Sequence, residues 1–503
     1  MKNRINDFIQ EASEWVYEIS INRIPQLSIE SAKLMFIDTI AAALNSLRSN
    51  WARILINNNY SIIERYPMLS IMFDYDSTLL YYGHLGHGII APILHYFVNN
   101  GNKLSGEGII EAIVASVEIS ARIAASLSLS SYRGQMMSPI HSLTTALLLS
   151  KINEEPPSVI RRSLIYALSF IIRPTREGFL TLSKIFTAAI SSYFGILAYE
   201  LAKNSSEDPN IDTLHAFLKS WDAPILIKPL SGLGKRWHIN TISVKKYPAC
   251  SYAQTAIELA IKLSKELSYY EIKQVDKIIL KENILTYLMD LGHERFIKGP
   301  YTPFTALQFY TPYLISSALI HKNFTIDNYS NTAINDAKVW SLVKKVVIEH
   351  YKDYTIKLLS EPLPFGVAFN ELSEDLIKKL SIILGISASE LETLKSRNYD
   401  LDNIDINNTR KYMGIGIEVY LSNGKRISGE EEIIEGFHGT DLNTKFNVTI
   451  NKLRRGLEPL IADEDEVNNM INTLLNLHKA SVNEARSLLN SLITVLQHSG
   501  RQE

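Results

Sequence analysis

Apolar residues in the first half of the chain recur at the spacing of helices. Between Ser28 and Leu44 they fall three or four positions apart, and Ser28 is predicted to cap the start of this helix. The stretch 105–127 predicts a second helix, rich in alanine and serine. Stretches 140–149 and 187–202 are apolar on nearly every side, which is typical of helices inside a large bundle.

The pattern changes near residue 232, where short β-rich segments begin to alternate with helical ones. Three segments have the composition or alternation of strands: 242–245, 275–280 and 415–421. The last is followed by Asn423-Gly424, the strongest short signal for a hairpin turn. Three helical patterns lie between the strands: 251–267, 304–321 and 336–351.

These patterns predict a mostly α protein with an α+β part. We expect a large all-helical domain built from both chain ends, residues 1–239 and 431–503, and a smaller inserted α+β domain, residues 240–430. Residues 355–411 are rich in Asn, Asp and Ser, so we expect a surface insertion there. Within it, only 374–384 has a helical pattern.

Composition narrows the possible partners. The 51 basic and 53 acidic residues leave a net charge of -2, and 46% of the chain is hydrophobic, which argues against disorder and against nucleic acid as the main partner. The single cysteine, Cys250, excludes an intrachain disulfide or a cluster held by several thiolates. Stretches 163–172 and 187–202 are judged too short or interrupted to span a membrane, and residues 1–18 lack a signal-peptide core. We therefore expect a cytoplasmic protein with no membrane partner.

Candidate chemistry is densest between residues 73 and 88. This segment places Asp74, Asp76, Thr78, His84 and His87 close together, with glycines around the histidines and a helical pattern after them. A histidine near carboxylates at the start of a helix has the tunable pKa that proton transfer needs. Two other interpretations stay open: ordinary hydrogen-bonded loop histidines, and a zinc site made by both histidines and a carboxylate.

A second candidate segment covers residues 245–252. Lys245 and Lys246 stand at the end of a predicted strand, just before a proline turn. Lysines there can bind substrate carboxylates, or one of them can be desolvated and act as a base. Solvated surface lysines are the alternative. Cys250, a small residue after the proline, is expected to be packed.

With these segments in view, the chain resembles the MmgE/PrpD family, which includes 2-methylcitrate dehydratases, cis-aconitate decarboxylases and iminodisuccinate epimerases. Five segments carry the resemblance in the family's order: 36–44 to its early helix containing Asp-Thr, 74–84 to D-x-D-D-T…H-P-x-G, 117–122 to E-V-x-x-R, 245–250 to K-x-Y-P-x-C, and 308–313 to F-S-x-P-Y.

The resemblance implies a helical domain with an α+β lid, usually in a homodimer, and an active site between the two. Its motifs place catalytic Asp74, Thr78 and His84 in the helical domain and Lys245 and Tyr287 in the lid. It implies no cofactor and no metal. The expected activity is that of a metal-independent lyase that acts on a small di- or tricarboxylate. The foremost expected reaction is dehydration of 2-methylcitrate or a citrate-like 2-hydroxy acid, as in propionate catabolism.

Within this mechanism, His84 is the candidate acid or base, positioned by Asp74. Lys245 would bind a carboxylate or stabilise the developing charge, Tyr287 would donate to the substrate oxygen, and Thr78 would position the substrate.

Three polar positions depart from the family pattern. The histidine of the family's R-G-F-H-P segment is missing from residues 133–138, and His141 is the nearest histidine that could replace it. A position that is basic in the family holds Thr181, with Lys184 nearby. The family's histidine shortly after the cysteine is replaced by Gln254. We expect Lys184 and Lys246 to bind the substrate. The departures also keep alternatives open: a decarboxylase or epimerase of a related acid, a non-catalytic carboxylate binder, and a metal-dependent hydrolase.

Overall fold

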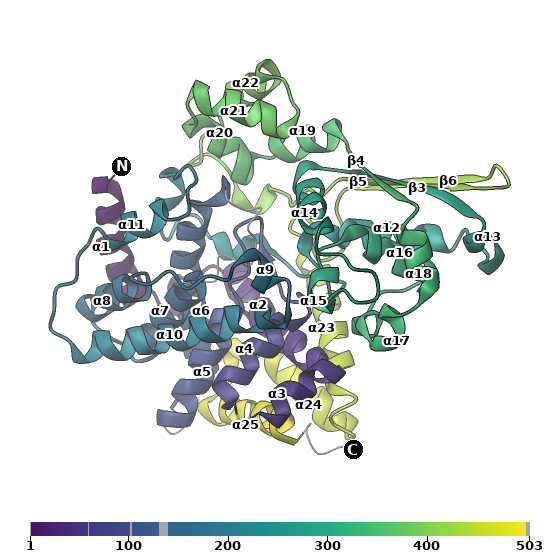
Figure 1. Cartoon of the computed structure of the whole chain (residues 1–503). Coiled ribbons are helices and arrows are strands. Elements are labelled where there is room, and N and C mark those ends of the chain that lie inside the picture. The colour runs from purple at the N-terminus through teal and green to yellow at the C-terminus, as the bar shows by residue number, and fades with distance from the viewer. Residues whose placement is uncertain (1, 59, 101–102, 130–138, 499–503) are drawn as a thin grey trace.

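The computed structural model describes residues 2–58, 60–100, 103–129 and 139–498. It is mostly helical with two small sheets, which confirms the expected fold class at that level (Figure 1). The helices of the first half are α1 (Lys2–Glu18), α2 (Gln26–Leu47), α3 (Arg53–Asn57), α4 (Ile62–Met72), α5 (His87–Asn100), α6 (Gly106–Ala125), α7 (Pro139–Ile152), α8 (Pro157–Ala167), α9 (Arg176–Phe179), α10 (Phe186–Asn204) and α11 (Thr213–Lys219).

Helix α7 lies at the centre of this bundle, in contact with α5, α6, α8 and α10. Its residues 139–150 are all buried, as their apolar pattern predicts. Close approach of α10 depends on Gly195, since a Cβ there would lie 2.4 Å from the Ser142 carbonyl oxygen. The long apolar helices predicted at 140–149 and 187–202 are thus confirmed.

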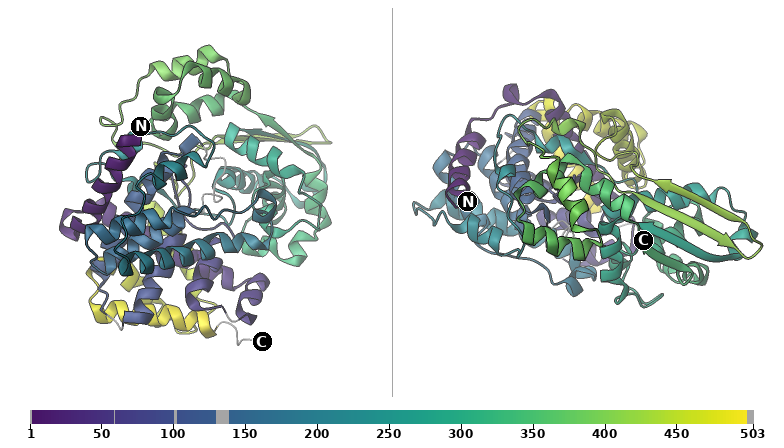
Figure 2. Two further views of the ribbon diagram at one scale, coloured as in Figure 1. Left: turned by 60° about the vertical axis from the view of Figure 1, so that its left-hand side comes forward. Right: turned by 90° about the horizontal axis from the view of Figure 1, so that it is seen from above.

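The last helices return to the first ones. They are α23 (Leu442–Leu457), α24 (Glu464–Leu475) and α25 (Val482–His498). Helix α23 packs along α2, while α25 contacts α4 and α6, so the yellow end of the chain lies against the purple beginning (Figure 2). A buried ion pair at 2.6 Å joins Lys452 Nζ to Asp38 Oδ1 across this contact.

The α+β part holds a four-stranded sheet in the order β4-β3-β5-β6. Its strands are β3 (Val275–Glu282), β4 (Val346–His350), β5 (Ile415–Leu421) and β6 (Arg426–Glu431). Only the β3–β4 pair is parallel within this sheet, and the predicted Asn423-Gly424 turn joins β5 to β6 with Gly424 at φ 88°. The surrounding helices are α12 (Gln254–Ser264), α13 (Tyr269–Lys273), α14 (Ile284–Glu294), α15 (Phe304–Leu307), α16 (Thr311–His321), α17 (Asn331–Ile334) and α18 (Ala337–Val343).

Several local predictions in this part are wrong. The stretch 336–351 is a short helix followed by β4, because the β-branched residues of β4 pair with β3. The stretch 304–321 breaks between α15 and α16, where the Gln308 carbonyl accepts from Cys250 N and Pro312 starts a new helix. The predicted strand 242–245 is reduced to two residues, β2 (Ile242–Ser243), which pairs with β1 (Thr78–Leu79).

Ser28 does not cap its helix. Helix α2 begins at Gln26 after Pro25, and Ser28 lies inside it with its hydroxyl donating to Asn240 Oδ1 at 2.9 Å. The proline ends the preceding extended segment, so the helix starts earlier than the serine signal indicates.

The 355–411 segment is more ordered than its composition predicts. Its expected helix is confirmed as α21 (Glu374–Leu384), but three others surround it: α19 (Lys352–Ser360), α20 (Val367–Glu371) and α22 (Ala388–Ser396). Serines that indicated loops are helix caps, as in the box formed by Ser387 and Glu390. These helices form the green layer at the top of Figure 1.

One stretch of the described chain, Leu182–Asn204, is long and apolar enough to cross a membrane by length and composition. The apolar stretch is thus longer than the 187–202 of the sequence pattern. However, 61% of its most apolar window is buried inside the structure, as in the core helix of a soluble protein.

Candidate active site

The site begins at the turn that follows α4. Asp74 takes a left-handed conformation, with φ 53°, which aspartate tolerates better than most residues. The turn buries the carboxylates of both Asp74 and Asp76 completely. Directly after it, the pairing of Thr78 with Ser243 brings the 245–250 segment alongside.

Asp74 lies between two lysines. Lys245 Nζ is 2.9 Å from its Oδ2 and donates to its backbone carbonyl at 2.5 Å, while Lys184 Nζ is 3.5 Å from Oδ1. Lys184 also donates to Gln308 Oε1 at 2.5 Å. Burial alone would raise the pKa of Asp74, but the two ammonium groups lower it to about 2. The carboxylate is therefore ionised throughout the physiological range.

Asp76 lies between two histidines. His84 Nδ1 donates to its Oδ2 at 2.8 Å, and His87 Nε2 lies 3.0 Å from the same oxygen. Burial would raise the pKa of Asp76, but the two imidazoles and Lys245 hold it well below its usual range. The expectation that Asp74 positions His84 is thus corrected: Asp76 does so, because the left-handed turn directs Asp74 to the lysines.

His84 is suited to accept a proton. Burial lowers its pKa, and the Asp76 carboxylate only partly offsets this, so the ring is neutral near pH 7. Since a carboxylate can only accept, the ring proton lies on Nδ1 and the lone pair on Nε2. This is the tautomer that a general base requires.

His141 lies beside the histidine pair. Its ring centre is 5.3 Å from that of His87, whose Nδ1 is 2.7 Å from Ser70 Oγ. Burial and the two nearby imidazoles hold the pKa of His141 well below its usual value. The segment 133–138, where the family histidine is missing, lies outside the described residues.

Lys411 completes the cluster, and sequence analysis missed it. Its Nζ donates to Thr78 Oγ1 at 2.6 Å and to Ser251 Oγ at 2.5 Å, with the side chain almost fully buried. Burial and the nearby charge of Lys245 lower the pKa of Lys411 to about 7. Burial lowers the pKa of Lys184 to about 8. The available signal was a lysine four residues before the start of β5, in a segment that the sequence analysis interprets as surface.

Two other predicted residues lie apart from this cluster. Lys246 Nζ is 3.0 Å from both Glu258 and Glu435, and its residue lines a separate cavity of about 290 Å³ that also holds Lys452 and Arg455. Tyr287 is half-buried on α14, with its ring 5.4 Å from that of His350. Among the described residues, no hydrogen bond links its hydroxyl to the cluster.

The altered family positions have local structural roles. Gln254 Nε2 donates to the carbonyls of Tyr247 and Ala249, and its Oε1 accepts from the Lys246 and Tyr247 amides, so it holds the proline turn in shape. Thr181 is exposed and donates to the Gly178 carbonyl. The positive charge comes instead from Lys184, three residues later. Cys250 is buried, as expected, and burial raises its pKa to about 12.

Three groups have the donor types of a metal site. Asp76, His84 and His87 each place one donor atom within 4.8 Å of the others. Lys245 Nζ, however, lies 3.9 Å from Asp76 Oδ1, and two more buried lysines belong to the same cluster. This positive surrounding opposes a divalent cation and favours an anion.

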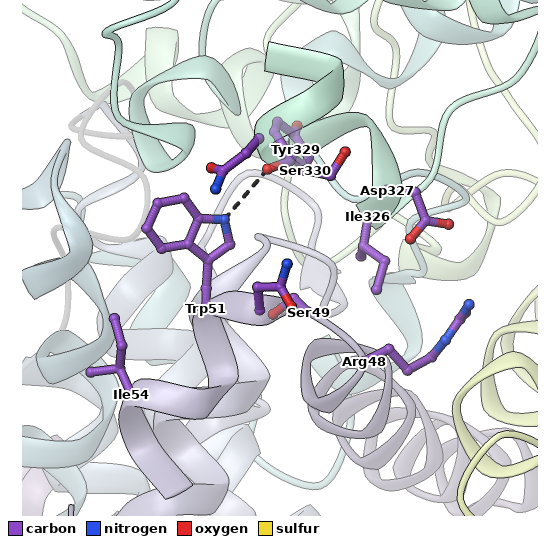
Figure 3. Close-up of a pocket in the computed structure, with 10 residues that line it drawn as sticks. Arg48, Ser49, Trp51, Ile54, Ile326, Asp327, Tyr329 and Ser330 are labelled. Atoms are coloured by element: carbon purple, nitrogen blue, oxygen red, sulfur yellow. Dashed lines mark hydrogen bonds between the residues drawn. The ribbon is translucent and has the colours of Figure 1, made fainter. Parts of the chain in front are cut away.

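A cavity of about 290 Å³ lies elsewhere, between the start of α3 and residues 326–331 (Figure 3). Trp51 Nε1 donates to the Tyr329 carbonyl at 3.4 Å in its wall, and the Trp51 ring stacks on Phe304. Its lining includes none of the cluster residues. The aspartate, lysine and histidine cluster is therefore the candidate active site.

Fold and cluster together define a mostly helical protein with buried acid–base groups. Residues 247–363, from the proline turn through β3 and β4 to just beyond α19, match the model of the MmgE/PrpD C-terminal domain. This match covers less than half of the chain, and over that part it agrees with the resemblance found in the sequence. No curated protein matches the chain.

Proposed function

We propose that the protein is a metal-independent lyase that removes water from a small 2-hydroxy di- or tricarboxylate, with 2-methylcitrate and citrate-like acids as the first candidates. Members of its family are often lyases or dehydratases. The observation that carries the proposal is one buried cluster that combines a neutral histidine with an excess of lysines.

The charge balance supports an anionic substrate. The described part of the cluster holds three lysines, Lys184, Lys245 and Lys411, against the two carboxylates of Asp74 and Asp76. The fourth nearby lysine, Lys452, is already paired with Asp38. The remaining positive charge is buried, so a substrate carboxylate that replaces water there gains strongly from the low dielectric.

The proposed dehydration uses the groups of the cluster together with Tyr287, which lies apart from them in this structure. Nε2 of His84 takes the proton from the carbon next to a substrate carboxylate, and the electron pair forms the new double bond. The hydroxyl on the neighbouring carbon leaves and takes a proton to become water, for which Tyr287 is the proposed donor. Lys245 and Lys184 stabilise the charge that builds on the carboxylate, and Thr78 orients the substrate.

We further propose that residues 1–239 and 431–503 form one domain and residues 240–430 a lid over it. The cluster draws on both: Asp74 and His84 come from the first, Lys245 and Lys411 from the second. Movement between them would admit the substrate to a cluster that is buried in this structure.

We also propose a cytoplasmic homodimer that buries the outer face of α10. Four apolar residues there are 46–59% exposed at helical spacing: Ile190, Tyr193, Leu197 and Leu201. A second copy with the same face would cover this stripe. Light scattering after size exclusion should give a dimer, and Leu197→Lys should shift it to monomer.

The activity test is a turnover screen of chelator-treated protein against 2-methylcitrate, citrate and cis-aconitate. Dehydration is expected to increase the absorbance of a conjugated double bond without release of carbon dioxide. Carbon dioxide release would show a decarboxylase instead. A folded protein silent on all three acids, and on their close analogues, would overturn the lyase proposal.

A further inference from the structure

Lys411 differs from the other lysines of the cluster in its partners. Lys184 and Lys245 each contact the Asp74 carboxylate, whereas Lys411 Nζ donates to two hydroxyls, those of Thr78 and Ser251. Among the described residues, no carboxylate lies within 4.0 Å of it. The Phe437 ring, with its centre 5.0 Å from Nζ, closes another side.

Such an environment is unfavourable for an ammonium group unless an anion completes it. Hydroxyls replace only part of the water lost on burial, and a buried charge without a counter-charge is costly. The hydroxyls of Thr78 and Ser251 accept from Lys411, so their own hydrogens remain available to donate. One ammonium and two hydroxyl donors around a point match the acceptor oxygens of a carboxylate.

We propose that Lys411, Thr78 and Ser251 form a dedicated subsite for a second carboxylate of the substrate, distinct from the carboxylate stabilised by Lys245 and Lys184. This inference rests on the proposed function and narrows it: the substrate carries at least two carboxylates. The subsite positions the substrate, while His84 moves the proton.

Protonation gives the subsite a measurable signature. Burial and the charge of Lys245 lower the pKa of Lys411 to about 7, although Asp74, Asp76 and the Cys250 thiol act in the opposite direction. At pH 8 the amine is mostly neutral, and a bound carboxylate favours its charged form. Binding must therefore take up a proton from the buffer.

The test uses propane-1,2,3-tricarboxylate, which has no hydroxyl to eliminate, and calorimetry at pH 8 in two buffers of different ionisation enthalpy. Lys411→Met should weaken binding about 10- to 100-fold, as expected for loss of a charged hydrogen bond, and reduce proton uptake. Lys411→Arg should bind within about fivefold of wild type but take up fewer protons, because arginine is always charged.

Lys445→Met is the matched control. Lys445 is also a buried lysine, 5% exposed, but it lies on α23 outside the cluster, and its pKa is lowered to about 8 by burial. Its removal should leave both affinity and proton uptake unchanged.

The outcomes separate the subsite from the activity. Equal affinity of wild type and Lys411→Met would overturn the subsite, and so would unchanged proton uptake in a folded Lys411→Arg variant. Binding with the expected signature but no turnover of any hydroxy acid would support the subsite and overturn the lyase. A wild-type protein that does not bind the tricarboxylate would overturn the subsite, and the turnover screen would decide on the lyase separately.

Discussion

Asp74 and Asp76 belong to the same turn and are equally buried, yet they have different partners. Asp74 lies between Lys184 and Lys245, and Asp76 between His84 and His87. The first arrangement fixes charge, since its pKa of about 2 keeps it ionised beside two cations. The second holds a neutral ring in one tautomer. Two adjacent carboxylates thus serve charge placement and proton transfer separately.

The largest expected effect is at the proton-transfer side. His84→Gln should lower kcat about 10³-fold, because it removes the imidazole that takes the proton in the proposed mechanism. The KM should change less than about threefold. His95→Gln, a change on the outer part of α5, serves as control and should leave kcat unaffected. Full turnover in steady-state assays of His84→Gln would contradict the assignment.

Asp76→Asn should lower kcat about 10²-fold with little loss of folding. The amide still fits the space but lets His84 adopt the wrong tautomer. The lost negative charge also shifts the acidic limb of the pH–rate profile to lower pH, since Asp76 raises the pKa of His84. An unshifted limb would argue that Asp76 does not act through His84.

Asp74→Asn should act chiefly on stability. It leaves Lys245 and Lys184 buried without their common carboxylate, and breaking a buried pair in this way costs about 3–5 kcal/mol. Chemical denaturation should show this loss, with a smaller loss for Asp76→Asn. Equal losses for both variants would remove the distinction between the two carboxylates.

The pH dependence should follow the lysines. Substrate binding needs Lys411 and Lys184 charged, so kcat/KM should fall as pH rises through about 7 to 8. The free energy of unfolding should change in the opposite direction. Both lysines have a lower pKa in the folded protein than in the unfolded chain, so the unfolded state binds more protons. The free energy of unfolding should therefore increase as pH rises toward about 10.5. Parallel activity and denaturation series in one buffer set would check both signs.

The smallest expected effect is that of metal removal. Chelation should leave turnover unchanged, because the lysines around Asp76, His84 and His87 oppose a divalent cation. Loss of activity that added zinc restores would assign these three residues to a metal site instead.

The sequence predicts much of this cluster because its motifs are local. Asp74, His84 and Lys245 stand at characteristic spacings along the chain. What it does not reveal is which aspartate faces which partner, since that depends on the left-handed φ of one residue. Lys411 escapes notice because its hydrogen-bond partner Thr78 is 333 positions away.

The errors in secondary structure have a similar origin. Strand β4 was hidden in a helical pattern because its pairing with β3 decides its conformation, and this partner is distant in sequence. The helices of 355–411 depend on serine caps, which composition alone counts as loop residues. The core helices α7 and α10, whose patterns are long and strongly apolar, were predicted well.

The contact between α2 and α23 has a consequence for synthesis of the protein. Asn45 Nδ2 donates to the Lys452 carbonyl 407 positions later, and Gly456 fits directly against Leu44. During translation α2 therefore emerges long before the surface that covers its alanine-rich side. The apolar surface of α2 therefore stays exposed on the nascent chain during most of translation, a stage at which binding by chaperones is expected.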